Sequence, residues 1–176
     1  MKDRLLRGCI AGAIGGIFAN MWSFFMGWME LSTLRFVDWT AIILYGHIAP
    51  FTLGEIAFAL LIQLGYCAGA GIIFSYLLLV ITSRNLYFRG WLFSCATWAM
   101  VYAVTLLFKV EGTIPLPLKT VISDFIGASI YGVVLAQCVK ALIPNTEKSL
   151  SGRSIINFMP EPAAKRFDKD KDDKDK

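Results

Sequence analysis

The chain has 176 residues, of which 56% are hydrophobic and 17% are charged, and its formal net charge is +4. Soluble domains carry about 25% charged residues, so this chain has too little polar surface to cover a water-soluble globule of its size. Its length favours one domain over an enzyme with a separate cofactor module. Composition therefore predicts an integral membrane protein.

Four apolar segments are long enough to cross a bilayer, since about 20 helical residues span roughly 30 Å of hydrocarbon. Their approximate ranges are 8–29, 53–81, 90–108 and 118–143. These runs lack the alternation of barrel strands, and backbone groups in lipid must be satisfied internally. We therefore expect an all-α membrane protein, a four-helix transmembrane bundle formed by residues 1–145.

Small residues recur at four-residue spacing in three of these spans. In lipid, such faces let helix backbones approach closely and associate. The expected helix-packing residues are Gly8, Gly12, Gly16, Gly65, Gly69, Ala128, Gly132 and Ala136. They would pack the helices of one chain together or form a contact between two copies, and we favour packing within one chain for most of them.

The connection after the first span contains an apolar run, 37–46, that is too short to cross the membrane. It suits a helix that lies in the outer interface, capped by Asp38, with Trp39 and Tyr45 at headgroup depth. A re-entrant segment is the alternative.

Two later spans have recognisable starts. Thr52 and Glu55 are spaced as in a capping box, in which the side chain of each residue accepts a hydrogen bond from the backbone amide of the other. Pro117 directly precedes the fourth span, where a proline costs no helical hydrogen bond. These signals favour helix starts near residues 53 and 118.

Asp124 is the most informative polar residue, because an ionisable group inside a span is costly and marks a functional hypothesis. One interpretation is a proton or cation relay through Asp124, Gln63 and Glu55. The structural interpretation, which we favour, pairs Asp124 with a lysine and uses Glu55 as a helix cap. The candidate polar network comprises Asp124, Glu55, Gln63, Asn20, Lys109 and Lys119.

Signals for enzymatic chemistry are weak. The sequence has no phosphate-binding loop, no Ser/His/Asp arrangement and no HExxH motif, and His47 is its single histidine. We expect no catalytic residues, no metal, no cofactor and no nucleic-acid partner. The expected partners are the lipid bilayer and either a second copy or another membrane protein.

Charge is distributed unevenly along the chain. Residues 146–176 hold eight of the 17 Lys and Arg and seven of the 13 Asp and Glu, which predicts a disordered charged tail. Near the membrane ends, eight Lys and Arg lie on the side of the two termini and three on the other side. The positive-inside rule then predicts that both termini are cytoplasmic.

The spans also show a weak internal similarity. Arg7-Gly8 and Arg89-Gly90 open the first and third spans, and acidic residues lie early in the second and fourth. This pattern is consistent with two parallel-repeat hairpins. Four-helix membrane proteins also share such residues at the ends of their spans through topology alone, without a duplication.

Three stretches carry a family resemblance: the Gly-rich segment 7–19, Gly65-Tyr66-Cys67, and Ser123-Asp124-Phe125-Ile126-Gly127. With them the chain resembles small uncharacterised bacterial inner-membrane proteins of the YagU/YqhR type over about residues 5–143. The resemblance implies a bacterial protein with four spans and supplies no catalytic residues.

These observations predict an integral protein of the bacterial inner membrane that acts as a structural or accessory component. The main alternative is a small transporter or ion-coupled permease that uses Asp124 with Glu55 or Gln63. A membrane enzyme that acts on lipid at segment 35–50 is a third and weaker interpretation.

Overall fold

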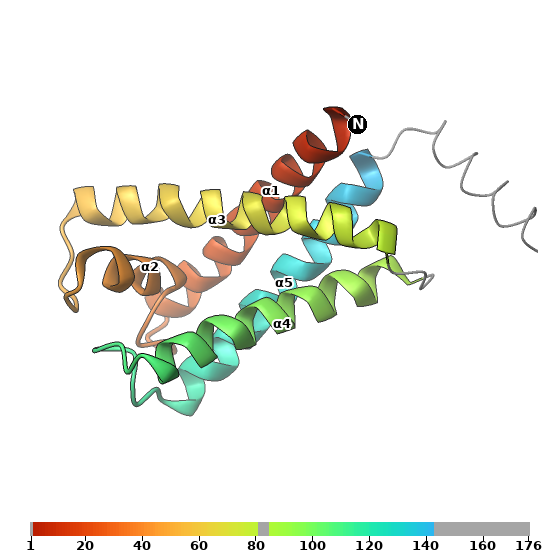
Figure 1. Ribbon diagram of the computed structural model, residues 1–176. Helices are drawn as coiled ribbons and strands as arrows, with labels where there is room; N and C mark the ends of the chain where they lie inside the picture. Colours follow the sequence, from red (N-terminus) through yellow and green to blue (C-terminus); the bar gives the residue numbers. More distant parts are fainter. Residues whose placement is uncertain (1, 81–84, 143–176) are drawn as a thin grey trace, which may run out of the picture. The chain divides into compact units, whose positions relative to one another are not determined.

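The computed structural model describes residues 2–80 and 85–142 (Figure 1). Within these ranges the elements are α1 (Lys2–Trp28), α2 (Phe36–Tyr45), α3 (Leu53–Val80), α4 (Leu86–Leu107) and α5 (Leu118–Leu142). All of them are helices, and α1, α3, α4 and α5 are long and apolar enough to cross a membrane. The predicted fold class is confirmed. The predicted tail, 146–176, lies outside the described residues.

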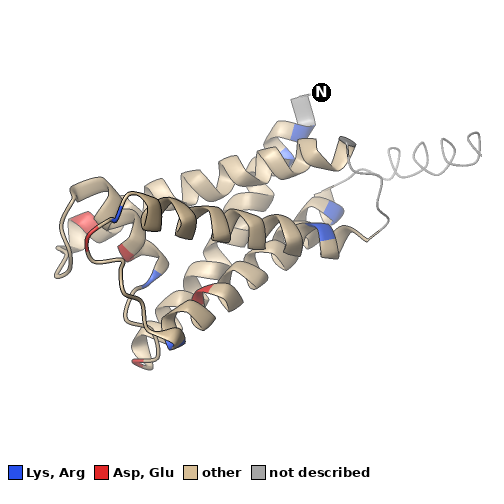
Figure 2. Ribbon diagram, turned by 60° about the horizontal axis from the view of Figure 1, so that its bottom comes forward, with Lys and Arg blue, Asp and Glu red and all other residues tan. Residues whose placement is uncertain are grey.

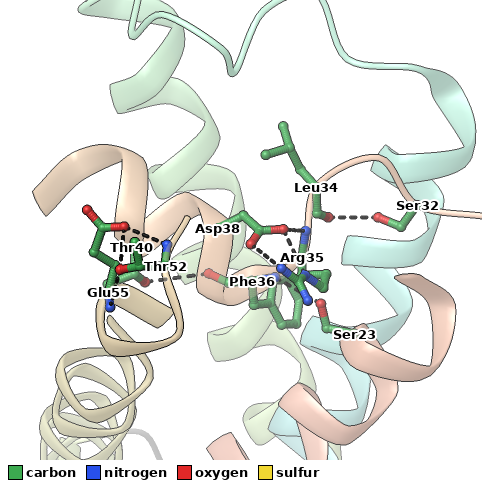
Figure 3. A network of polar contacts seen from close by, with 9 residues as sticks. All are labelled: Ser23, Ser32, Leu34, Arg35, Phe36, Asp38, Thr40, Thr52 and Glu55. Atoms are coloured by element: carbon green, nitrogen blue, oxygen red, sulfur yellow. Dashed lines mark hydrogen bonds and ion pairs between the residues drawn. The ribbon is translucent and has the colours of Figure 1, made fainter. Parts of the chain in front are cut away.

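The predicted capping box opens α3. The Thr52 backbone amide donates to Glu55 Oε2 at 2.7 Å, and the Glu55 amide donates to Thr52 Oγ1 at 3.3 Å. The two residues therefore satisfy two amides that the first helical turn leaves unpaired. The side chain of Glu55 is used at the helix start (Figure 3).

Helix α4 begins four residues before its predicted start at residue 90. The Asn85 side chain accepts a hydrogen bond from the Phe88 amide at 3.2 Å, which makes Asn85 the N-cap. Asn is among the favoured N-cap residues because its short side chain reaches the unpaired amides of the first turn. The hydrophobic run alone did not include this polar cap.

Helix α2 is anchored to the bundle by its first turn. The Asp38 carboxylate accepts the Arg35 backbone amide at 2.8 Å and the Arg35 guanidinium at 2.8 and 3.0 Å (Figure 3). The Phe36 amide donates to Ser23 Oγ of α1 at 2.9 Å. The N-cap of α2 is Arg35, so the expectation that Asp38 is the cap was wrong. Asp38 is the third residue of the helix, and its side chain accepts a hydrogen bond from the backbone amide of Arg35.

One aromatic residue of α2 packs inside the bundle. Trp39 is 5% exposed and packs against the ring of Tyr102 in α4, with centroids 5.0 Å apart. The ring of Trp39 therefore fills space between helices and does not face outward, and its expected headgroup depth stays a prediction. On the same helix, Ile43 and Leu44 are the exposed side chains.

The spanning helices pack in two glycine-lined contacts. Helix α1 packs against α3 and α5, α4 packs against α5, and α2 packs against α3 (Figure 1). A Cβ atom at Gly12 would collide with the Cys67 carbonyl oxygen, and one at Gly8 would lie 2.8 Å from the Gly71 carbonyl oxygen. Between α4 and α5, Gly90 and Gly132 meet in the same way.

The other predicted packing residues divide into two groups. Gly16 faces the Cys67 side chain, Ala136 lies at Gly90, and the Ala128 carbonyl accepts Ser94 Oγ at 2.5 Å. Gly65 and Gly69 have no neighbouring atom within 4 Å of an added Cβ. Within this chain, the contact of α3 with α1 therefore runs through Gly71, and Gly65 and Gly69 lie on an open face of α3.

Charged residues lie mainly at the two ends of the bundle (Figure 2). We call the end where α1 and α4 begin and α5 ends the basic end, because the charged residues coloured there are Lys and Arg; the acidic residues gather mainly at the opposite end, together with Arg35, Lys109 and Lys119. The described side chains at the basic end include Arg4, Arg7, Arg89 and Lys140. The intervening stretch of the bundle is almost entirely uncharged.

Candidate binding cavity

A cavity of about 310 Å³ lies between α3 and α4 and is lined by residues of all five helices. These two helices are not among the closely packed pairs, although the loop that joins them is short. Most of the lining is apolar, and the exceptions include Asp124 of α5 and Gln63 of α3. The volume is at the lower end of the range of small-molecule sites.

Asp124 is the centre of the polar part of the cavity. It is 2% exposed, and its Oδ2 accepts a hydrogen bond from the Tyr102 hydroxyl at 2.7 Å. At 1.5 Å per helical residue it lies about 9 Å from the start of α5. The position is within a span, where an ionised carboxylate without a counter-charge is unfavourable.

Aromatic rings surround this carboxylate. Tyr102 packs between Trp39 and Trp98, with ring centroids 5.0 and 4.7 Å apart. We call Trp39, Tyr102 and Trp98 the aromatic cluster; all three line the cavity. The cluster joins α2 to α4 across the site and positions the hydroxyl that donates to Asp124.

Three buried polar atoms of the cavity lining have no hydrogen-bond partner among the described residues. They are Trp39 Nε1, Trp98 Nε1 and Gln63 Oε1. Trp39 neighbours the Asp124 carboxylate, but its indole N–H does not reach hydrogen-bond geometry. Buried polar groups without partners are uncommon, because each loses its hydration on burial. The residues that line the cavity therefore include two N–H donors and one carbonyl acceptor that no described residue satisfies.

The two ends of the cavity differ. Toward the loop between α3 and α4, Phe74 packs against Phe93 with centroids 5.3 Å apart, and Phe74 is completely buried. Four lining residues are exposed: Ile43 and Leu44 of α2, at 59% and 41%, and Ile62 and Tyr66 of α3, at 41% and 53%. Tyr66 lies about 20 Å along the 28-residue helix α3, so the exposed lining of α3 lies near mid-span.

The structure separates the predicted polar network into parts. Asp124 and Gln63 line the same cavity. Asn20 is buried nearby on α1, but its Nδ2 donates to the Gly16 carbonyl at 2.9 Å and its Oδ1 has no partner in the described chain. Lys109 and Lys119 are both exposed. Among the described residues neither lysine pairs with Asp124, so the expected lysine partner is replaced by the Tyr102 hydroxyl.

Glu55 belongs to a different site. Besides its capping bonds to Thr52, its Oε1 lies 3.3 Å from His47 Nε2 in the preceding connection. His47 Nδ1 also bonds the Ile48 carbonyl at 2.9 Å. The Ile48 carbonyl and then Glu55 raise the pKa of His47 above its ordinary 6.5. Glu55 does not line the cavity.

The aromatic cluster was not among the predicted site residues. Trp98 and Tyr102 are four residues apart and therefore share a face of α4, which is a signal that the sequence contains. Trp39 carried no such signal, because aromatic residues at a membrane boundary are ordinarily interfacial anchors. Their convergence on Asp124 depends on tertiary packing.

The described residues include no group of three or more His, Cys, Asp or Glu side chains placed to hold a metal ion. The four apolar helices are those expected of a multi-pass integral membrane protein. Comparison with protein families, curated proteins and solved structures gives no match for this chain. The cavity and its side chains therefore carry the functional argument.

Proposed function

We propose that this protein is a small transporter of the bacterial inner membrane, coupled to an ion, in which Asp124 and Gln63 form part of the substrate and ion site. The observation that carries the proposal is the cavity at span depth, lined by a buried acid that has no Lys, Arg or His beside it among the described lining residues. Intramembrane acids that face a cavity are the usual components of proton and cation pathways.

The open side of the cavity supports entry from the bilayer. The exposed lining residues, Ile43, Leu44, Ile62 and Tyr66, are apolar or aromatic, and Ile62 and Tyr66 lie near mid-span of α3. A substrate that reaches Asp124 by this route must first dissolve in the membrane. Glu55, the other acid of the relay predicted from sequence, has no part in this proposal because its carboxylate caps the start of α3.

In the proposed orientation both termini are cytoplasmic. The basic end of the bundle, where α1 and α4 begin, then faces the cytoplasm, in agreement with the positive-inside rule. The cavity would narrow toward the cytoplasm and lie beneath α2 on the outer side. The resemblance to bacterial inner-membrane proteins supports the same location.

Proton flux into liposomes tests the coupling. The full chain is reconstituted with an internal pH indicator, and a potassium diffusion potential is imposed with valinomycin. We expect proton entry above that of protein-free liposomes, and a return to this background in Asp124→Asn. Glu55→Gln is the matched control, since it removes an acid of another long helix that does not line the cavity. Flux at background in the wild type would refute an ion-coupled transporter.

An accessory role is the second candidate. Two observations favour it: Asp124 already has a hydrogen-bond donor in Tyr102, and α3 presents Gly65 and Gly69 on an open face. Such a face permits close approach of another helix. Gentle extraction followed by identification of co-purified proteins distinguishes this role, because a stoichiometric membrane partner with no flux would favour it.

A further inference from the structure

We infer that the cavity binds an organic cation, with its ammonium group beside Asp124 and its apolar substituents against the aromatic cluster. The inference rests on the proposed function and names its substrate class. It follows from three features of the cavity: the acid without a counter-charge among the described residues, the aromatic lining and the exposed apolar residues of the lining.

The first step concerns charge. Asp124 is 98% buried, and among the described residues that line the cavity none is Lys, Arg or His. The Tyr102 hydroxyl supplies one hydrogen bond to the carboxylate but no charge. Burying a carboxylate without a cation is costly, and a cationic ligand relieves that cost. The cavity is therefore electrostatically complementary to a positive group.

The second step concerns the rings. An ammonium group is attracted to the faces of aromatic rings within about 6 Å, most strongly to Trp. Trp39, Tyr102 and Trp98 all line the cavity next to Asp124. Gln63 Oε1, which has no partner in the described chain, adds a carbonyl acceptor on the opposite wall. The Asp124 carboxylate, the aromatic ring faces and the Gln63 carbonyl thus supply negative or partly negative groups to the lining of one largely apolar volume.

The third step concerns access. The exposed lining residues are Ile43 and Leu44 of α2 and Ile62 and Tyr66 of α3, and all four are apolar or aromatic. A ligand that enters past them from the hydrocarbon must itself be largely apolar. A small inorganic cation does not meet this condition, because it keeps its hydration shell in water. An alkyl or aryl ammonium ion combines the charge with the required apolar surface.

Two probes of the same shape test the inference. Benzyltrimethylammonium carries the charge, and neopentylbenzene replaces its nitrogen with carbon and is neutral. The full chain in lipid nanodiscs is titrated with each, and binding is followed by tryptophan fluorescence, to which Trp39 and Trp98 contribute from the cavity wall. We expect the wild type to bind the cation about tenfold or more tightly than the neutral probe.

Variants locate the charge effect. Asp124→Asn should remove the preference for the cation and leave the affinity for neopentylbenzene unchanged, whereas Glu55→Gln should keep the preference. Equal affinity for both probes, or a preference that survives Asp124→Asn, would overturn the inference, as would failure of both probes to bind. If Asp124→Asn does not fold, the comparison of the two probes on the wild type still decides.

The outcome is separable from that of the flux experiment. Cation preference with proton flux at background would leave a cation-binding membrane protein and remove the ion-coupled transporter. Flux that depends on Asp124 without cation preference would keep the transporter and remove this substrate class.

Discussion

Asp124 and Glu55 are the two acids of the long helices that entered the sequence-based relay, and their surroundings give them different roles. Glu55 lies in the first turn of α3, where it accepts two bonds from Thr52 and contacts His47. Asp124 is enclosed by apolar and aromatic side chains and has one donor, Tyr102. The same residue class thus acts as a helix cap in one position and as a buried acceptor in the other.

The contact between His47 and Glu55 predicts a pH dependence. The pKa of His47 is raised by the Ile48 carbonyl and by Glu55, so the protonated imidazole is favoured in the folded protein. A group whose pKa rises on folding contributes stability below its ordinary pKa, 6.5 for His47, and loses that contribution as the pH rises through the raised value. We expect this contact to weaken as the pH rises through the raised pKa of His47.

Nuclear magnetic resonance can follow this titration directly, because His47 is the single histidine of the chain. The imidazole should titrate above pH 6.5, and Glu55→Gln should move its midpoint back toward that value. A wild-type midpoint at or below 6.5 would contradict the contact.

At the scale of the helices, glycine defines which surfaces touch. Gly8 and Gly12 of α1 meet Gly71 of α3, and Gly90 of α4 meets Gly132 of α5. The pair α1 and α3 and the pair α4 and α5 therefore each include a glycine-to-glycine contact. The predicted duplication of a helical hairpin would produce such a similarity. Helices in lipid associate largely through such close packing, since lipid chains are as apolar as the side chains they replace.

Two alanine substitutions of equal size separate packed from open glycines. Gly12→Ala places a methyl group against the Cys67 carbonyl oxygen, so it should lower the free energy of unfolding by about 1–3 kcal/mol. Gly69→Ala adds the same methyl group where no atom lies within 4 Å, and its effect should stay within about 0.5 kcal/mol. Unfolding titrations in mixed micelles compare the two.

The difference between the free energies of unfolding of these two variants tests the contact between α1 and α3. Equal stability of Gly12→Ala and Gly69→Ala would show that the α1–α3 contact is not as close as described. A loss confined to Gly69→Ala would place the packing surface of α3 on its other face, and the self-association of that variant should then be measured.

For the whole molecule, the orientation in the membrane is the main prediction. The basic end of the bundle carries Arg4, Arg7, Arg89 and Lys140, and we expect it to face the cytoplasm. A fluorescent protein that matures only in the cytoplasm should be fluorescent when fused after Lys176. Alkaline phosphatase, which is active only outside, should be active when fused after His47 and inactive after Lys176. Phosphatase activity at Lys176 would reverse the topology.

The number of spans and the start of α3 were predictable because both depend on local sequence. A span needs only a long apolar run, and a capping box needs only Thr52 and Glu55 at the correct spacing. The start of α4 was missed because Asn85 lies outside the apolar run that defined the span. Local signals therefore give the elements and leave their polar edges uncertain by about a turn.

The cavity could be predicted only in part. Asp124 and Gln63 stand out in sequence because polar groups are rare within spans. The donor to Asp124 is Tyr102, 22 residues earlier on another helix, and Trp39 comes from a connection. These contacts depend on how α2 and α4 pack, which no local pattern encodes. The same limit explains why Gly71, rather than Gly65 or Gly69, meets α1.

Ile62 and Tyr66 line the cavity and are exposed near mid-span, so a ligand that enters past them meets the acyl chains first. At mid-span, the surrounding solvent is acyl chain, present at an effectively constant and very high concentration. Each binding event is then an exchange in which a ligand displaces lipid, so the apparent affinity includes the affinity of the cavity for that lipid. Lipids that differ in chain length or branching would thus compete with the ligand to different extents. The lipid composition of the bilayer would set the ligand concentration that the protein needs for binding.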